Sequence, residues 1–89
     1  MDEKAFRAAR EAEGYTQFAV VEWEPGRVNE THTHDFTASA FLLDGRITVE
    51  TADESTTCRA AGDTFTLGAG IPHREVVGPD GVKFLVARK

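Results

Sequence analysis

Polar and hydrophobic residues alternate along most of the chain, and short turn-forming stretches separate the alternating segments. Alternation with a period of two is typical of β-strands that bury one face. Short strands with Gly, Pro and Asp turns about every eight to twelve residues indicate an antiparallel sandwich or barrel, so we expect an all-β fold. The segments with this pattern are residues 15–24, 30–35, 38–51, 56–59, 63–67, 73–77 and 82–88.

Turn signals divide the predicted strands. The pair Asp44-Gly45 interrupts the longest strand pattern and indicates a turn or a bulge. Residues 52–55 are polar and predict a turn, and residues 78–81 (Gly-Pro-Asp-Gly) predict a hairpin that joins the last two strands.

The start of the chain has a helical pattern instead. Phe6 and Ala9 share one face at a spacing of three, and Gly14 is suited to end the helix. We expect a short helix within residues 1–14 and a barrel over residues 15–89, together one domain of residues 1–89. About three turns of isolated helix are marginal in water, so this helix must dock on the rest of the protein.

Some predicted strands are apolar on both faces, which a sheet open to water would not be. Ala40 and Leu42 share one face, while Phe41 and Leu43 share the other. The outer face is therefore expected to be covered by the helix, by a second subunit, or by both, and we expect a homodimer.

Charge and cysteine content narrow the function. The net charge is −5 and the basic residues are scattered, so a nucleic acid partner is not expected. No apolar run approaches the roughly 20 residues of a membrane span, and the charged start lacks the apolar region of a secretory signal, so we expect a cytoplasmic protein and no membrane partner. The single Cys58 excludes an internal disulfide, and we interpret it as a small residue of the core.

All three histidines of the chain stand where they could bind a metal. His32 and His34 lie two residues apart and would face the same side of a strand, and His73 follows a Gly/Pro turn from which it could join them. Imidazole is a common ligand of Fe, Zn, Ni and Cu, so we expect one divalent metal of this group.

Two runs of residues resemble the conserved motifs of the cupin family. The first is Gly26-x5-His32-x-His34, followed by Gly45. The second is Gly62-Asp63-x-Phe65-x-Leu67-Gly68-x-Gly70-x-Pro72-His73. The resemblance implies a small β-barrel of the double-stranded β-helix (jelly roll) type, often dimeric, in which His32, His34 and His73 bind the metal.

The chain departs from the family pattern at two positions. Ala38 stands where the pattern has a Glu ligand, and Val77 stands where it has Asn. A three-histidine site without that carboxylate would favour imidazole-binding metals over Mn²⁺. Glu75 shares a face with His73, and it could be a distant ligand, a hydrogen-bond partner of a ligand, a general base or an ordinary solvent-facing residue.

Several apolar residues are expected to form the wall of a small, largely apolar pocket for a small organic molecule. They are Phe36, Ala38, Ala40, Leu42 and Phe65. Three functions fit these features. The first is a small metalloenzyme, resembling the family's dioxygenases or acting as an isomerase or lyase. The second is a non-enzymatic module that binds or senses a small ligand, and the third is a metal-stabilised dimeric scaffold.

Overall fold

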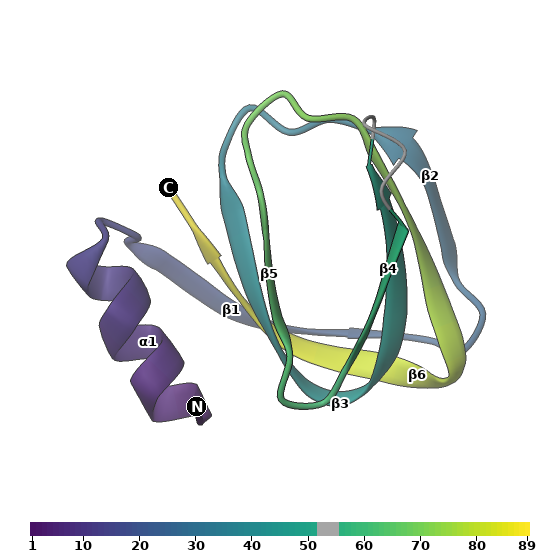
Figure 1. Cartoon of the computed structure of the whole chain (residues 1–89), viewed down its shortest axis with the longest axis horizontal. Coiled ribbons are helices and arrows are strands. Elements are labelled where there is room, and N and C mark those ends of the chain that lie inside the picture. The colour runs from purple at the N-terminus through teal and green to yellow at the C-terminus, as the bar shows by residue number, and fades with distance from the viewer. Residues whose placement is uncertain (52–55) are drawn as a thin grey trace.

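The computed structural model describes residues 1–51 and 56–89, and in them an N-terminal helix precedes an all-antiparallel β-sheet (Figure 1). The elements are α1 (Glu3–Ala12), β1 (Gln17–Trp23), β2 (Val28–His32), β3 (Ala38–Thr51), β4 (Thr56–Ala60), β5 (Thr64–Leu67) and β6 (His73–Arg88). The predicted fold class is confirmed. The turn predicted at residues 52–55 lies outside the described residues.

Two long strands, β3 and β6, form the centre of the sheet. They pair along their whole length, from Ala38 opposite Arg88 to Thr51 opposite His73. Strand β5 pairs with the first part of β3 and β4 with its last part. In the same way β2 pairs with the first part of β6 and β1 with its last part. The sheet therefore has two halves that share the same two strands.

Both long strands bend between these halves, so that the sheet curls on itself (Figure 1). The β3–β6 register shifts on either side of Asp44-Gly45, which confirms the bulge predicted there. Gly45 has a φ of +79°, and a Cβ atom at this position would lie 2.0 Å from the Gly81 carbonyl oxygen. Only glycine fits at this crossing of the two strands.

The predicted hairpin over residues 78–81 is wrong. Strand β6 continues through these residues, and both of its parts pair with β3 rather than with each other. The Gly-Pro-Asp-Gly sequence bends the strand opposite the β3 bulge. The same residue types favour a tight turn and a strand bend, so local sequence does not distinguish the two.

The core has two layers, one on each face of the β3–β6 pair. Leu42 and Ile47, both 0% exposed, belong to the inner layer between the halves of the sheet. Phe41 and Leu85 belong to the outer layer beneath α1. The predicted alternation of Phe41 and Leu42 between the two faces is therefore confirmed.

The helix is capped at both ends and covers the outer layer. The Asp2 side chain accepts a hydrogen bond from the Ala5 N–H at 2.8 Å, and Gly14, with a φ of +95°, ends the helix as predicted. Phe6 is fully buried and its ring stacks on Phe41 at 5.6 Å between centroids. The ten residues of α1 span about 15 Å, half of what a membrane crossing needs. The described residues contain no helix that is long and apolar enough to cross a membrane.

Cys58 is exposed, so the prediction that it belongs to the core is wrong. Its partner across the β3–β4 ladder is Thr48, which alternates with the buried Ile47 and Val49. Residues opposite each other in a ladder share a face, so Cys58 points outward with Thr48. The length of a short strand does not reveal which of its faces is buried.

Replacing Phe6 with Ala tests whether α1 is part of the folded core. We expect Phe6→Ala to lower the free energy of unfolding by about 3 kcal/mol or more, because the variant loses a fully buried aromatic ring. Urea denaturation followed by circular dichroism measures this. Lys4→Ala, on the exposed side of the same helix, should change it by less than about 0.5 kcal/mol. Equal effects of the two variants would show that α1 is not docked.

Candidate metal centre

Two adjacent strands bring the three histidines together. His32 is the last residue of β2, His73 is the first residue of β6, and the two are partners in the β2–β6 ladder. His34 lies in the loop just beyond β2, where its carbonyl oxygen accepts a hydrogen bond from the Gly70 N–H at 2.8 Å. The ladder and the loop contact therefore hold all three residues at one place.

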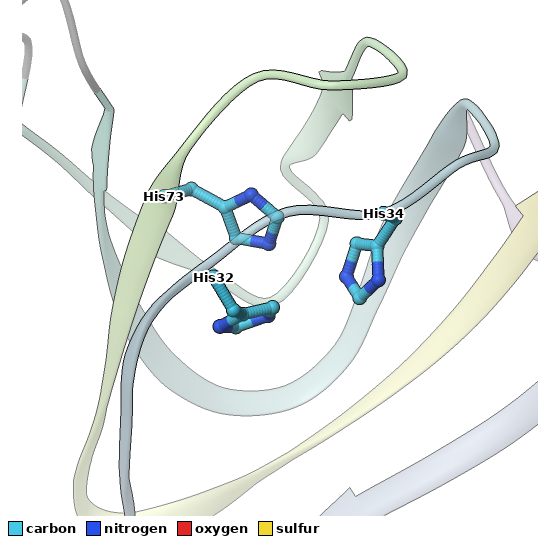
Figure 2. Close-up of side chains that lie close together, drawn as sticks. All are labelled: His32, His34 and His73. Carbon is cyan, nitrogen blue, oxygen red and sulfur yellow. The ribbon is translucent and has the colours of Figure 1, made fainter.

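The three imidazoles point toward one another (Figure 2). Their ring centroids are 4.3 Å (His32–His73), 4.9 Å (His32–His34) and 5.0 Å (His34–His73) apart. One ring nitrogen from each lies within 4.8 Å of the other two. Strand β2 ends at His32, earlier than the predicted end at residue 35, yet the His34 ring still lies on the same side as the His32 ring.

Backbone carbonyls fix the protonation pattern of two of the rings. His32 Nδ1 lies 2.6 Å from the Glu30 carbonyl oxygen, and His73 Nδ1 lies 2.9 Å from that of Ile71. A carbonyl oxygen can only accept a hydrogen bond, so in each ring Nδ1 carries the proton and donates. In the neutral rings the lone pair is then on Nε2, the usual arrangement in metal-binding histidines.

The Nε2 atom of His73 has no hydrogen-bond partner among the described residues, although the side chain is only 2% exposed. A buried lone pair without a donor is costly. A bound cation at this position would satisfy it.

His34 is electrostatically suited to bind a metal at neutral pH. Burial lowers its pKa below the ordinary value of 6.5, and the neighbouring imidazoles of His73 and His32 lower it further. A metal ligand must be the neutral imidazole. At pH 7 His34 is therefore ready to bind without first losing a proton.

Glu75 brings a carboxylate into the same site. It is 6% exposed, so of the roles left open by the sequence the solvent-facing one does not apply. Its Oε1 atom lies 3.7 Å from His32 Nε2 and accepts a 3.4 Å hydrogen bond from Asn29 Nδ2. A carboxylate oxygen and the lone pair of a neutral imidazole are both acceptors, so their proximity favours a cation between them.

These residues fit a divalent transition metal. Nitrogens bound tetrahedrally to Zn²⁺ at about 2.0–2.1 Å are about 3.3 Å apart, so the observed spacing needs only small side-chain rotations to reach it. Three imidazoles and one carboxylate form a donor set that Fe²⁺, Zn²⁺, Ni²⁺ and Cu²⁺ accept.

A cavity of about 500 Å³ opens beside the histidines. Four of the predicted wall residues line it, together with Glu75: Phe36, Ala38, Ala40 and Phe65. Leu42, also predicted for the wall, does not line it, because Leu42 is fully buried in the inner core layer. Glu30 lies at the rim, 79% exposed in its side chain and paired with Arg74 at 2.9 Å.

Sequence interpretation missed several residues of the cavity, and strand parity would have found some of them. Trp23 and Val21 alternate along β1, and Arg88 continues the alternation of Phe84 and Val86 along β6. The pairing of β1 and β6 with the rest of the sheet decides which parity faces the cavity, and this pairing is not visible in the local pattern.

The two positions that depart from the cupin motifs have different surroundings. Ala38 lines the cavity and presents only a methyl group there. Val77 is 2% exposed in the inner core layer, where it packs with apolar neighbours. Ala38 therefore changes the site, whereas Val77 adds an apolar side chain to the core.

Similar proteins were found among solved structures, whereas no curated protein matched the sequence. A protein from Streptococcus pyogenes, SPY1581, of unknown function, is 24% identical, with a TM-score of 0.69 over 80% of this chain and 60% of that chain. The oxalate decarboxylase of Lactobacillus farciminis, in a formate complex, is 28% identical, with a TM-score of 0.69 over 81% of this chain and 22% of that chain. The DMSP lyase DddQ of Ruegeria pomeroyi is 21% identical, with a TM-score of 0.74 over 81% and 36%.

These proteins are longer, and the chain spans 60% or less of each of the three. The sequence model of the cupin domain matches residues 19–87, which include the whole sheet except the ends of β1 and β6. The motif resemblance, the curled antiparallel sheet and this match agree. The chain belongs to the cupin family.

Proposed function

We propose that this cupin is a small metalloenzyme that uses one divalent metal to bind and activate a small organic molecule. The observation that carries the proposal is the group of hydrogen-bond acceptors that lie close together at the site. The buried Nε2 of His73 lacks a partner among the described residues, and His32 Nε2 faces the Glu75 carboxylate at 3.7 Å. A metal ion would neutralise this arrangement, and it would lie beside the cavity.

In this proposal His32, His34 and His73 each bind the metal through one ring nitrogen, and Glu75 supplies the fourth donor. Glu75 takes the place of the carboxylate that Ala38 lacks. When bound, the metal supplies Lewis acidity and open positions for substrate. Asn29 holds the Glu75 carboxylate in place through its amide.

The remaining wall residues exclude water and fix the size of the substrate. Phe36 stacks on His34 with a centroid distance of 4.7 Å, which restricts the movement of that ligand. Phe65 and Ala40 add apolar surface. The same donor set supports oxygen-dependent oxidation with Fe²⁺ and isomerase or lyase chemistry with Zn²⁺ or Ni²⁺, so the native metal decides between these reactions. The oxalate decarboxylase among the similar structures supports an enzymatic role.

One observation favours the alternative, a non-enzymatic module that binds a small ligand. If Glu75 binds the metal, the described cavity residues offer no other free carboxylate as a base, because Glu30 pairs with Arg74 at the rim. Mass spectrometry of bound ligands separates the two functions. If the protein is an enzyme, a ligand incubated with the metal-loaded protein is recovered chemically changed. If the protein is a binding module, the ligand is recovered intact.

The expected homodimer and the expected cytoplasmic location stay predictions. Helix α1 covers the outer face of the sheet around Phe41 and Leu85, so a second subunit is not required at that part of the face. Val20, 50% exposed on β1, is a large apolar residue available for such a contact.

Removing one histidine should lower metal binding to less than half. Untagged protein purified without chelator or nickel resin should contain about one equivalent of metal by plasma mass spectrometry, and His73→Ala should contain less than half as much. Metal should also raise the melting temperature of the wild type, because it binds only the folded site. Cys58→Ser removes an exposed potential ligand elsewhere and should change neither value. Full occupancy in both His73→Ala and His34→Ala would contradict the ligand assignment.

Neutralising Glu75 should weaken metal binding without removing the histidines. We expect Glu75→Gln to lower metal affinity by about 10- to 100-fold, because it removes a negative donor and keeps the size of the side chain. Competition with a chelating dye measures the affinity. Glu30→Gln, at the exposed rim, is the matched control and should leave it unchanged. Identical affinities of wild type and Glu75→Gln would show that Glu75 is not a donor.

The tautomers of two histidines can be measured directly. In metal-free, ¹⁵N-labelled protein at pH 8, long-range ¹H–¹⁵N spectra should show the proton of His32 and His73 on Nδ1, because each donates to a backbone carbonyl. Addition of Zn²⁺ should then shift the Nε2 signals most. A proton on Nε2 in either ring would contradict the proposed coordination.

A further inference from the structure

We propose that the substrates or ligands of this cavity are small organic carboxylates, and that Arg88 binds the carboxylate group. This inference rests on the proposed function, since it names the ligand class of the same site. It comes from the position of Arg88, from its lack of an acidic partner among the described residues, and from the space beside Ala38.

Arg88 is held at the cavity, near the histidines. It follows Phe84 and Val86 in the alternation of β6, and all three line the cavity. Its guanidinium lies over the Phe36 ring, 4.5 Å from the centroid, and Phe36 stacks on His34. The stack of guanidinium, phenyl ring and imidazole places the positive charge one side chain away from the metal ligands.

Of the arginines that line the cavity, Arg88 is the one without an acidic partner among the described residues. Arg27, the other arginine in the lining, pairs with Glu24 at 3.7 Å and donates to Asn29 Oδ1 at 3.0 Å. Within residues 1–51 and 56–89, Arg88 forms no ion pair. A guanidinium offers two parallel N–H groups that match the two oxygens of a carboxylate.

The space for such a carboxylate lies beside Ala38. Ala38 and Arg88 are directly opposite in the β3–β6 ladder, and both line the cavity. A glutamate at position 38 would reach toward Arg88 and the histidines, but alanine leaves this space empty. A ligand carboxylate between Arg88 and the metal would occupy the place of that side chain.

The rest of the cavity sets the size and polarity of the ligand. A volume of about 500 Å³ is suited to a small molecule. Phe65, Ala40 and Phe84 supply apolar walls for the body of the ligand. The net charge of −5 does not attract anions to the protein as a whole, so recognition of an anion has to come from a local cation such as Arg88.

The test compares an acid with its uncharged amide on metal-loaded protein. Cyclohexanecarboxylate and cyclohexanecarboxamide have nearly the same shape, and the fluorescence of Trp23, the single tryptophan, reports binding because Trp23 lines the cavity. Calorimetry gives an independent affinity. We expect the acid to bind at least tenfold more tightly than the amide.

Three variants of the site locate the carboxylate. Arg88→Gln should weaken binding of the acid at least tenfold and leave metal content and amide binding unchanged, and Arg88→Lys should have a smaller effect. Ala38→Glu should also abolish acid binding, because its own carboxylate pairs with Arg88, while metal is retained. Arg74→Gln is the matched control, since Arg74 pairs with Glu30 and Glu50 outside the cavity and should bind acid as the wild type does.

The outcomes separate this inference from the proposed function. Equal binding of acid and amide, or acid binding unchanged in Arg88→Gln, would overturn the carboxylate site while a normal metal content leaves the metalloenzyme proposal intact. A third outcome is that the wild type takes up no metal but still binds the acid, and that Arg88→Gln loses this binding. It would support the carboxylate site and contradict the metal site. Acid binding retained in Ala38→Glu would overturn the position assigned to the carboxylate.

Discussion

The pairing of β3 with β6 determines the position of every other part of the structure. The two strands contain 14 and 16 residues and remain paired through a bend at which Gly45 meets Gly81. All four shorter strands attach to one of these two. The same ladder puts His73 at one end of β6 and Arg88, opposite Ala38, at the other. Arg88 lines the cavity together with His32 and His34, and these two histidines lie beside His73.

A chain of this size can form only a small core, and the cavity makes that core smaller. About 60% of its unfolded surface can be buried, and the docked helix adds the outer core layer that the sheet alone would leave exposed to water. Burying His73 and Glu75 without a cation lowers stability further, because His73 Nε2 has no partner among the described residues and Glu75 is a buried carboxylate. In the proposed site, metal binding offsets this cost, so function and stability depend on the same ion.

Features set by nearby residues could be predicted from the sequence, and features set by strand pairing could not. The helix, its stop at Gly14 and the bulge at Asp44-Gly45 follow from local conformational preferences, and the grouping of the three histidines follows from spacing and motif. The continuous β6 and the exposed Cys58 depend on which strand lies opposite. Arg88 was missed for the same reason.

The charges of the proposed site explain why a carboxylate ligand and an alanine at position 38 belong together. A divalent metal bound by three neutral imidazoles and Glu75 keeps a net positive charge, and Arg88 adds another nearby. A glutamate at position 38 would permanently lower this positive charge by one unit and fill the space beside Arg88. With Ala38 the charge stays available, and the apolar side chains that line the cavity leave a ligand carboxylate few other polar partners there. The ligand then supplies the carboxylate that the polypeptide lacks.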